Sequence, residues 1–371
     1  MLCYTGLSQV SILNSQYSNC CCIFAAMKSQ NIRHFTLPEL EVYFGELGEK
    51  KFRAKQVYEW IWTKQVHSIE EMTNLSKELR QKLTDNFTLP ALVINNTQRS
   101  ADGTVKSSFR TVDGHLVEGV LIPTDNRVTA CVSSQIGCSL SCKFCATGYI
   151  DRKRNLDYDE IFDQVVLINK QSEEIYGKKL TNIVFMGMGE PLLNYKNVLK
   201  SIERITSPDG LGMSPRRITV STAGVAKMIR QLGDDKVKFK LALSLHAAND
   251  NKRHDIMPIN DSNNIKSLIE ALNYFYKQTK NEITFEYILF NNLNDSIQDA
   301  DELTKIYRQV PADLVNIIEY NPIEFAQFTK PDEDKVAVFM KHLEKNRVNA
   351  HLRRSRGKDI DAACGQLANK N

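Results

Sequence analysis

The sequence lacks the features of a membrane or secreted protein. None of its 371 residues falls in a run of eighteen apolar side chains, so we expect no transmembrane helix and no membrane partner. Residues 1–27 carry no charged side chain, and the basic segment that opens a secretory signal is therefore missing. We expect residues 1–27 to be a disordered extension, and N-terminal sequencing of the native protein tests whether they belong to the mature chain.

A strong charge of one sign is also absent. The formal net charge is only +4, which permits a nucleic-acid partner without arguing for one. Basic residues do cluster at 152–154, 216–217 and 353–356. Lys and Arg near a site can neutralise phosphates, although a run of charge is more often a solvated surface.

Cysteine is too unevenly distributed for a disulfide scaffold. The chain has nine cysteines, and four of them lie in the first 27 residues. The other five are Cys131, Cys138, Cys142, Cys145 and Cys364. A reduced cytoplasmic protein that uses thiols for metal binding and chemistry fits this distribution better than a secreted one.

Three of these cysteines share one short loop with the spacing C-x3-C-x2-C. They are Cys138, Cys142 and Cys145. A structural zinc site commonly takes four ligands from two C-x2-C pairs or from nearby histidines, and only one such pair is present here. Three thiolates can hold a [4Fe–4S] cluster and leave one iron open. The loop therefore predicts an iron–sulfur enzyme, with structural zinc as the alternative.

The rest of the chain divides into four predicted segments after the extension. Residues 28–95 form a small helical domain, and residues 96–127 form a β-rich connector with turns at Asp102-Gly103 and Asp113-Gly114. Residues 128–357 alternate apolar strands with amphipathic helices. Residues 358–371 form a C-terminal segment that carries Cys364.

The alternating segment predicts an α/β fold. The expected strands are 128–132, 181–187, 216–222, 238–245, 282–289 and 313–319. The expected helices are near 157–176, 194–206, 224–233, 263–279, 296–309 and 333–346. Parallel strands need crossover connections, so six β–α pairs imply a parallel sheet, which we interpret as an incomplete (β/α)6 barrel. Sites in such folds lie at the carboxyl ends of the strands, where the cysteine loop also falls.

Polar residues recur at these strand ends. Gly189 and Glu190 follow the second strand in the run Gly-Met-Gly-Glu-Pro-Leu, where glycine lets the backbone approach a ligand closely. Further polar ends are Ser221, Ser244-Leu245-His246 and Asn321. A lone polar residue here is usually a cap, but several ends that meet at one face favour a ligand site.

The cysteine spacing after the first strand resembles the radical S-adenosylmethionine superfamily. Phe144, just before the last cysteine, matches the aromatic residue usual there. The resemblance implies that the open iron chelates S-adenosylmethionine, whose reductive cleavage yields a 5′-deoxyadenosyl radical. By resemblance its contacts are Gly189, Glu190, Ser221, Ser244, Leu245, His246 and Asn321.

A narrower resemblance covers roughly residues 30–370. The segments 118–123, 131–138 and 359–367 look like those of the dual-specificity RNA methyltransferases that methylate C2 of adenine. That family acts on one adenosine of large-subunit ribosomal RNA and one in the anticodon region of certain transfer RNAs. The resemblance implies RNA as partner, with residues 28–95 as an accessory RNA-binding domain. There Lys50, Lys51, Arg53 and Lys55 lie beside Tyr58 and Trp60, although these aromatics could instead form the core.

The family mechanism assigns the two remaining cysteines. C2 of adenine is electron-poor and cannot attack the methyl group of S-adenosylmethionine directly. By resemblance, Cys364 is methylated by a first S-adenosylmethionine, and a second, consumed in the same turnover, generates the radical that activates the S-methyl group. Cys131 would then resolve the protein–RNA adduct by a transient disulfide with Cys364, and Glu118 would accept the C2 proton. Taken singly, each of these residues would more often have a structural role.

Three rivals to this function stay open. The related adenine-C8 methyltransferases share the cluster loop and both catalytic cysteines. A radical activase acting on protein would need neither Cys131 nor Cys364. A structural zinc or RNA-binding module would have no enzymatic activity. The resemblance also implies an electron donor such as flavodoxin or ferredoxin, and nothing in the sequence demands more than a monomer.

Overall fold

A computed structural model describes residues 30–369, which divide between Ala91 and Leu92 into two units. The expected extension at 1–27, with its four cysteines, lies outside the described residues. Across the described part of the chain, no helix combines the length and apolarity needed to cross a membrane.

The first unit is helical. Its elements are strands β1 (Gln30–Asn31) and β2 (Phe87–Thr88), which pair in parallel, and helices α2 (Leu37–Glu46), α3 (Phe52–Trp62) and α4 (Lys77–Asn86). Helix α2 begins at a capping box, in which the side chains of Thr36 and Glu39 satisfy each other's backbone N–H groups. Apolar residues at helical spacing, such as Val57, Ile61 and Trp62 of α3, are buried. The predicted N-terminal helical region is confirmed.

The second unit is built on one ten-stranded mixed sheet, in the order β14-β13-β12-β11-β10-β9-β6-β5-β4-β3. The strands are β3 (Val93–Arg99), β4 (Val105–Arg110), β5 (Leu116–Pro123), β6 (Val128–Cys131), β9 (Asn182–Phe185), β10 (Ile218–Thr222), β11 (Lys240–Ser244), β12 (Ile283–Leu289), β13 (Leu314–Glu319) and β14 (Ala350–Arg353). Strands β6 and β9 to β14 run parallel, whereas β3 to β6 pair in antiparallel fashion. A small ribbon of β7 (Gln135–Ile136) and β8 (Arg154–Asn155) brackets the cysteine loop.

The predicted six-strand barrel is confirmed only as an α/β fold with alternating parallel strands. All six expected strands are present, but β14 adds a seventh, and the β-rich connector belongs to the same sheet through the pairing of β5 with β6. Strand β14 escaped prediction because its four residues, Ala350–Arg353, are exposed or half-buried and give no apolar run. Strand β12, by contrast, is buried along its whole length.

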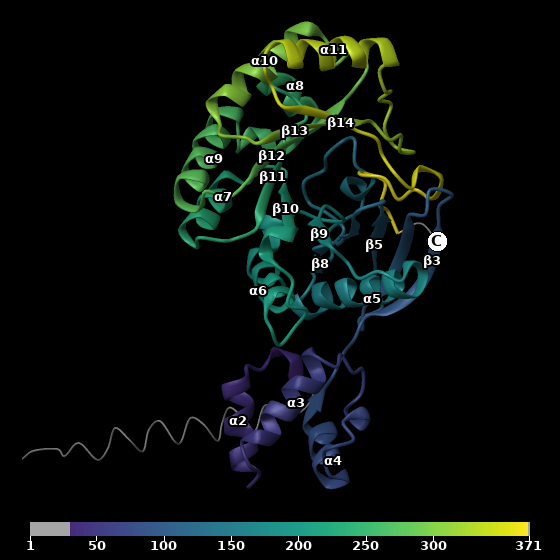
Figure 1. Cartoon of the computed structure of the whole chain (residues 1–371), viewed down its shortest axis with the longest axis vertical. Helices are drawn as coiled ribbons and strands as arrows, with labels where there is room; N and C mark the ends of the chain where they lie inside the picture. Colours follow the sequence, from purple (N-terminus) through teal and green to yellow (C-terminus); the bar gives the residue numbers. More distant parts are fainter. Residues whose placement is uncertain (1–29, 370–371) are drawn as a thin grey trace, which may run out of the picture. The chain divides into compact units, whose positions relative to one another are not determined.

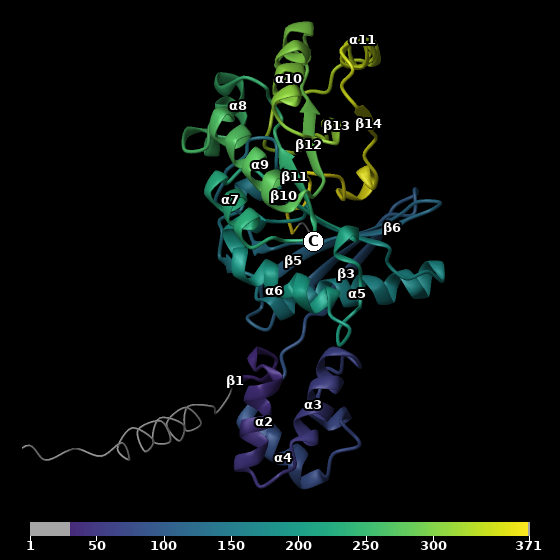
Figure 2. The same ribbon diagram turned by 60° about the vertical axis from the view of Figure 1, so that its left-hand side comes forward.

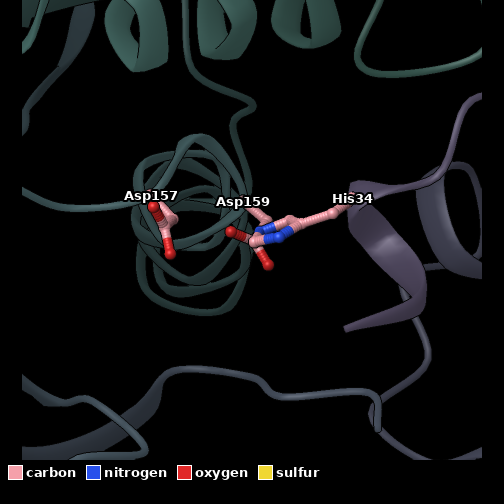
Figure 3. A group of neighbouring side chains, drawn as sticks. All are labelled: His34, Asp157 and Asp159. Atoms are coloured by element: carbon pink, nitrogen blue, oxygen red, sulfur yellow. The ribbon is translucent and has the colours of Figure 1, made fainter. Parts of the chain in front are cut away.

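Within the described part of the second unit, seven helices connect and flank the strands: α5 (Tyr158–Tyr176), α6 (Tyr195–Thr206), α7 (Ala226–Asp234), α8 (Asp250–Ile256), α9 (Ile265–Thr279), α10 (Ile297–Gln309) and α11 (Glu333–Lys345). Helices α7, α9, α10 and α11 follow the curve of the parallel strands on one side (Figure 1). Helix α5 packs on α6, β5 and β6 (Figure 2). Asp157 and Asp159 stand at its N-terminus (Figure 3), where Asp157 forms a capping box with Glu160. Helix α8 was not predicted.

The C-terminal segment returns across the sheet to the antiparallel strands, where it is drawn in yellow beside β5 (Figure 1). Two backbone N–H groups, of Ala368 and Asn369, donate to Oε2 of Glu118 on β5. Earlier in the segment, Gly365 accepts a backbone hydrogen bond from Ala146, directly after the cysteine loop. The chain end therefore contacts both β5 and the end of the cysteine loop, which lie far from it in the sequence.

Candidate active site

The three loop cysteines line one cavity at the carboxyl ends of the parallel strands. Its empty volume is about 860 Å³, and it opens to solvent. Backbone hydrogen bonds from Cys138 to Ile150 and from Cys145 to Cys142 hold the loop. Gly148 permits its tight return, because a Cβ there would lie 2.7 Å from the carbonyl oxygen of Cys142. The loop is thus preformed around the cavity.

The electrostatics of the three thiols suit a cationic cluster. Burial raises the pKa of Cys138 to about 11. Burial, and then the neighbouring Cys145 and Cys138, raise the pKa of Cys142 well above its ordinary value, and burial also raises the pKa of Cys145. Three thiolates so close together would repel one another unless cationic iron compensates their charge. The residues present therefore fit a [4Fe–4S] cluster held by three thiolates.

Glu190 and Gly189 form one wall of the same cavity. Oε2 of Glu190 accepts the backbone N–H of Ala223 (2.7 Å), and Oε1 accepts that of Leu192 (2.9 Å). Burial raises the pKa of Glu190, and these hydrogen bonds oppose the rise. Gly189 has φ +89°, and a Cβ on it would lie 2.4 Å from Cβ of Gln135. The turn after β9 therefore requires glycine, and it holds a buried carboxylate at the cavity wall.

The other strand ends reach the cavity unequally. Ser221, Ser244 and His246 line it, and the hydroxyls of the two serines lie 3.2 Å apart. Leu245 and Asn321 are absent from the lining among the described residues. Leu245 is buried in the core, and its N–H donates to the backbone carbonyl of Glu286. Asn321 instead donates to the backbone carbonyl of Cys364. The buried Oδ1 of Asn321 has no partner within residues 30–369.

His246 is neutral in this setting. Burial, followed by the charge of Arg253, lowers its pKa to about 3. Its Nδ1 accepts the backbone N–H of Ile288 (3.1 Å), so the ring proton sits on Nε2. The ring also packs edge-to-face on Phe144 of the cysteine loop, with centroids 4.8 Å apart. His246 thereby links the end of β11 to the loop.

Cys364 stands between this cavity and a second, smaller one. It lines both, together with Cys145, Met186 and Arg353, whereas Cys131 lines only the second. The backbone around Cys364 is fixed, because Asn321 Nδ2 donates to its carbonyl (3.2 Å) and Ala146 donates to that of Gly365 (2.7 Å). The structure thus brings the distant Cys364 to the cysteine loop and to Cys131.

Cys131 ends β6 and is buried. Burial raises its pKa to about 12, the nearby Cys364 contributes in the same direction, and Arg353 opposes the rise. All five cysteines within residues 30–369 are free thiols, so the structure contains no disulfide between Cys131 and Cys364. In this arrangement Cys131 is a protonated thiol beside its expected partner.

Glu118 lies on β5 outside the lining of both cavities. Its side chain is 1% exposed, and Oε1 lies 3.6 Å from Nζ of Lys106 on β4. Oε2 accepts the N–H groups of Ala368 (2.9 Å) and Asn369 (3.1 Å). The structure therefore gives this carboxylate a buried cation and two backbone donors, and the C-terminal segment covers it.

Sequence reasoning missed Glu286 at the cavity. Glu286 is buried on β12, accepts a hydrogen bond from Asn316, and lies 3.5 Å from Nη1 of Arg353. Arg353 belongs to the basic cluster that precedes Cys364, which was considered for RNA contact at the border of the barrel mouth; the structure places Arg353 in the lining of both cavities. The pKa of Arg353 is raised, most strongly by the nearby Cys364 and to a lesser extent by Glu286 and Cys131. The available signal was a glutamate in the middle of the apolar run 283–289, where a buried charge needs a partner.

The remaining basic clusters differ in whether their side chains are free to contact RNA near the cavity. Arg154 is committed to ion pairs with Asp113 and Glu160, at 2.7 Å each. Arg216 and Arg217 precede β10, at the opposite end of that strand from the cavity. In the first unit, Tyr58 is buried in the core, while Lys50, Lys51 and Lys55 are exposed.

Comparison with known proteins shows a close likeness along most of the chain. Residues 30–89 match the family model described as the ribosomal RNA large subunit methyltransferase N-terminal domain, and residues 132–304 match the radical SAM superfamily. A protein of Cytophaga hutchinsonii named "Probable dual-specificity RNA methyltransferase RlmN" is 58% identical, covering 93% of this chain and 94% of its own. A protein of the same name from Christiangramia forsetii is 52% identical, covering 92% and 97%. The crystal structure of a radical SAM methyltransferase from Sphaerobacter thermophilus is 39% identical, covers 91% of this chain and 99% of that one, and superposes with a TM-score of 0.85.

Proposed function

This chain belongs to the RlmN family of dual-specificity RNA methyltransferases, and we propose that it methylates C2 of adenosine in both large-subunit ribosomal RNA and transfer RNA. One observation carries the proposal: Cys364 lines both the cavity of the three loop cysteines and the cavity of Cys131. A methyl carrier must face the source of its methyl group and the thiol that releases it, and this position provides both.

The loop cysteines Cys138, Cys142 and Cys145 would hold the [4Fe–4S] cluster. Reductive cleavage of S-adenosylmethionine at an open iron is the chemistry that such a cluster supplies. For the cofactor itself, Gly189, Glu190, Ser221, Ser244 and His246 offer groups that line the cavity. Leu245 and Asn321 would act from the adjacent wall, and the free buried oxygen of Asn321 is an acceptor that suits an amino group.

Cys364 would carry the methyl carbon. Its thiol loses a proton and gains a methyl group from one S-adenosylmethionine, and a second is consumed when that carbon is transferred to C2. Arg353 lines both cavities and opposes the rise in the pKa of Cys131, so it would favour the thiolate of Cys131. Cys131 would then attack the sulfur of Cys364 and release the methylated base, forming a transient disulfide.

Glu118 would accept the proton that leaves C2. Its carboxylate is held by Lys106 and by the N–H groups of Ala368 and Asn369, and it is closed to solvent. This role requires residues 368–369 to move aside when RNA binds. Once these N–H groups withdraw, Oε2 would be left without a donor and could accept the proton from C2.

The remaining parts of the molecule take supporting roles in this proposal. Residues 28–95 would be an accessory RNA-binding domain, in which the exposed Lys50, Lys51 and Lys55 contact phosphates. Residues 96–127 connect it to a partial β/α barrel at 128–357, and residues 358–371 carry Cys364. We further propose a cytoplasmic location, since the five described cysteines are free thiols. The protein would act as a monomer, and a flavodoxin or ferredoxin would supply its electron.

Anaerobic reconstitution with iron and sulfide, followed by nucleoside mass spectrometry of ribosomal and transfer RNA, tests the proposal. We expect 2-methyladenosine in both RNA classes. The Cys364→Ala variant should bind iron normally but form no 2-methyladenosine. Formation of 8-methyladenosine alone would instead place the chain with the adenine-C8 enzymes. Unimpaired methylation by Cys364→Ala, or a colourless zinc-containing protein, would contradict the mechanism.

A further inference from the structure

Two exposed aromatic rings pair beside the active site. Of the Phe, Tyr and Trp side chains within residues 30–369, three are exposed, and two of these, Tyr149 and Phe325, contact each other. Tyr149 is 47% exposed and Phe325 is 55% exposed, with ring centroids 5.3 Å apart and planes inclined by 32°. Contiguous exposed apolar surface, unlike an isolated exposed ring, is a feature of binding sites.

Both rings are anchored on segments that hold Cys364. Tyr149 ends the short 3-10 helix Ala146–Tyr149, whose first residue donates to the carbonyl of Gly365. Its hydroxyl donates to the carbonyl of Lys143 inside the cysteine loop (3.0 Å). Phe325 follows β13 in a loop tied to the C-terminal segment, because Asn321 donates to Cys364 and Gln366 donates to the carbonyl of Pro322. The pair therefore stands directly beside the backbone that carries the methyl-accepting thiol.

Charged residues surround the pair, with a small excess of cations. Lys143, Arg152 and Lys153 are exposed on the segment of Tyr149, and Lys330 is exposed on that of Phe325. Three exposed acids, Asp151, Glu324 and Asp332, lie in the same segments. The four cations outnumber the acids by one, and they are available to neutralise the phosphates of a nucleic acid.

We propose that Tyr149 and Phe325 form a stacking platform for a nucleotide that flanks the target adenosine, an inference that rests on the proposed function. A target base must leave its stack to reach Cys364, so a neighbouring base loses its partner. An exposed aromatic pair replaces that lost contact, while the nearby lysines and arginines take the phosphates. Stacking on an aromatic face tolerates any base, which suits an enzyme that accepts two RNA classes with different flanking sequences.

The platform makes a specific kinetic prediction. Base–aromatic stacking contributes about 1–3 kcal/mol per base, so replacing both rings with alanine should raise KM for RNA about 5- to 150-fold. The value of kcat at saturating RNA should change less than about threefold, because neither ring contacts the reacting atoms in this proposal. Leucine at both positions keeps apolar bulk but removes the π face, so this double variant should raise KM for RNA almost as much as the alanine variant. The double variant Tyr149→Phe with Phe325→Tyr should keep the wild-type KM, because both positions retain an aromatic face.

The experiment combines steady-state methylation of a transfer RNA with direct measurement of its Kd. Val338→Ala on α11, another exposed apolar position, is the matched control and should leave KM and Kd unchanged. Methylation of Cys364 without RNA, followed by mass spectrometry, is measured for every variant. A leucine double variant with wild-type KM and Kd overturns the platform. Loss of RNA-independent Cys364 methylation in both aromatic variants also overturns it, because the rings would then be structural.

The same data separate this inference from the proposed function. If wild-type protein binds RNA but methylates none, the proposed function fails, and weaker RNA binding by the leucine variant still supports the platform. If wild-type protein methylates RNA and the leucine variant binds and reacts as well as wild type, only the platform fails. A variant that loses capture of a protein partner, with RNA binding intact, would assign the pair to protein recognition and overturn the proposal.

Discussion

Replacing Lys106 with methionine should strongly destabilise the second unit. Lys106 and Glu118 are 5% and 1% exposed, and the ammonium lies 3.6 Å from the carboxylate. Without the cation, the carboxylate stays buried with only the N–H groups of Ala368 and Asn369 as partners. Removing one partner of a buried ion pair typically costs about 3–5 kcal/mol, so we expect a loss of free energy of unfolding in that range.

Paired variants separate the cost of a lone buried charge from the loss of packing. The double variant Lys106→Met with Glu118→Met should lie within about 1 kcal/mol of wild type or above it, because apolar replacement of both ions is often neutral or stabilising. Arg230→Met is the surface control. Arg230 and Glu270 lie 3.4 Å apart but are 44% and 54% exposed, so its loss should cost only about 0–1 kcal/mol.

The assay can observe the two units separately. Both tryptophans, Trp60 and Trp62, lie in the first unit, so tryptophan fluorescence in urea follows that unit. Far-ultraviolet circular dichroism is dominated by the larger second unit, which contains the ten-stranded sheet. Lys106→Met should shift the circular dichroism transition and leave the fluorescence transition in place. A cost as small as that of Arg230→Met would refute the reasoning, as would a double variant less stable than the single one.

Two further predictions follow from the cavity wall. Burial lowers the pKa of His246 to about 3 from 6.5, so the unfolded chain binds the additional proton between those values. Stability is then fully present above about pH 6.5 and falls as pH drops toward 3; His246→Gln should flatten this dependence in urea unfolding at pH 7 and pH 5, and an unchanged slope would contradict it. Gly189→Ala places a Cβ 2.4 Å from Gln135 at φ +89°, so affinity for S-adenosylmethionine by calorimetry should fall at least about tenfold. Gly45→Ala, where a Cβ meets nothing within 4 Å, is its control, and equal affinities in both variants would refute the argument.

The sequence predicted most of the sheet because burial on both faces leaves a continuous apolar run. Strand β12 is buried at each of its seven residues, and it was predicted within one residue at its start. Strand β14 has no such run, since its pairing with β13 is set by the sheet edge and not by burial of its side chains. Edge strands of this kind are specified by tertiary contact, which local pattern does not report.

The cavity was predicted where motif and topology agreed. Cys138, Glu190 and His246 follow parallel strands, and Ser221 lies at the end of one; the carboxyl ends of these strands must share one edge. The partners of Glu118 could not be predicted in the same way. Lys106 meets it diagonally across β4 and β5, and Ala368 reaches it from the chain end, so both contacts depend on how the connector and the C-terminal segment fold back.

The contacts of the C-terminal segment allow its two proposed tasks to be separated. Cys364 is held through its carbonyl and that of Gly365, so its side chain is left to face either cavity by rotation about its own bonds. Glu118 is covered only later in the segment, by the N–H groups of Ala368 and Asn369. Between them, the hydroxyl of Thr147 donates to the carbonyl of Leu367 (2.7 Å) and fixes a boundary. Opening the last residues would therefore uncover Glu118 while the anchors of Cys364 stay in place, because the two sets of hydrogen bonds share no group.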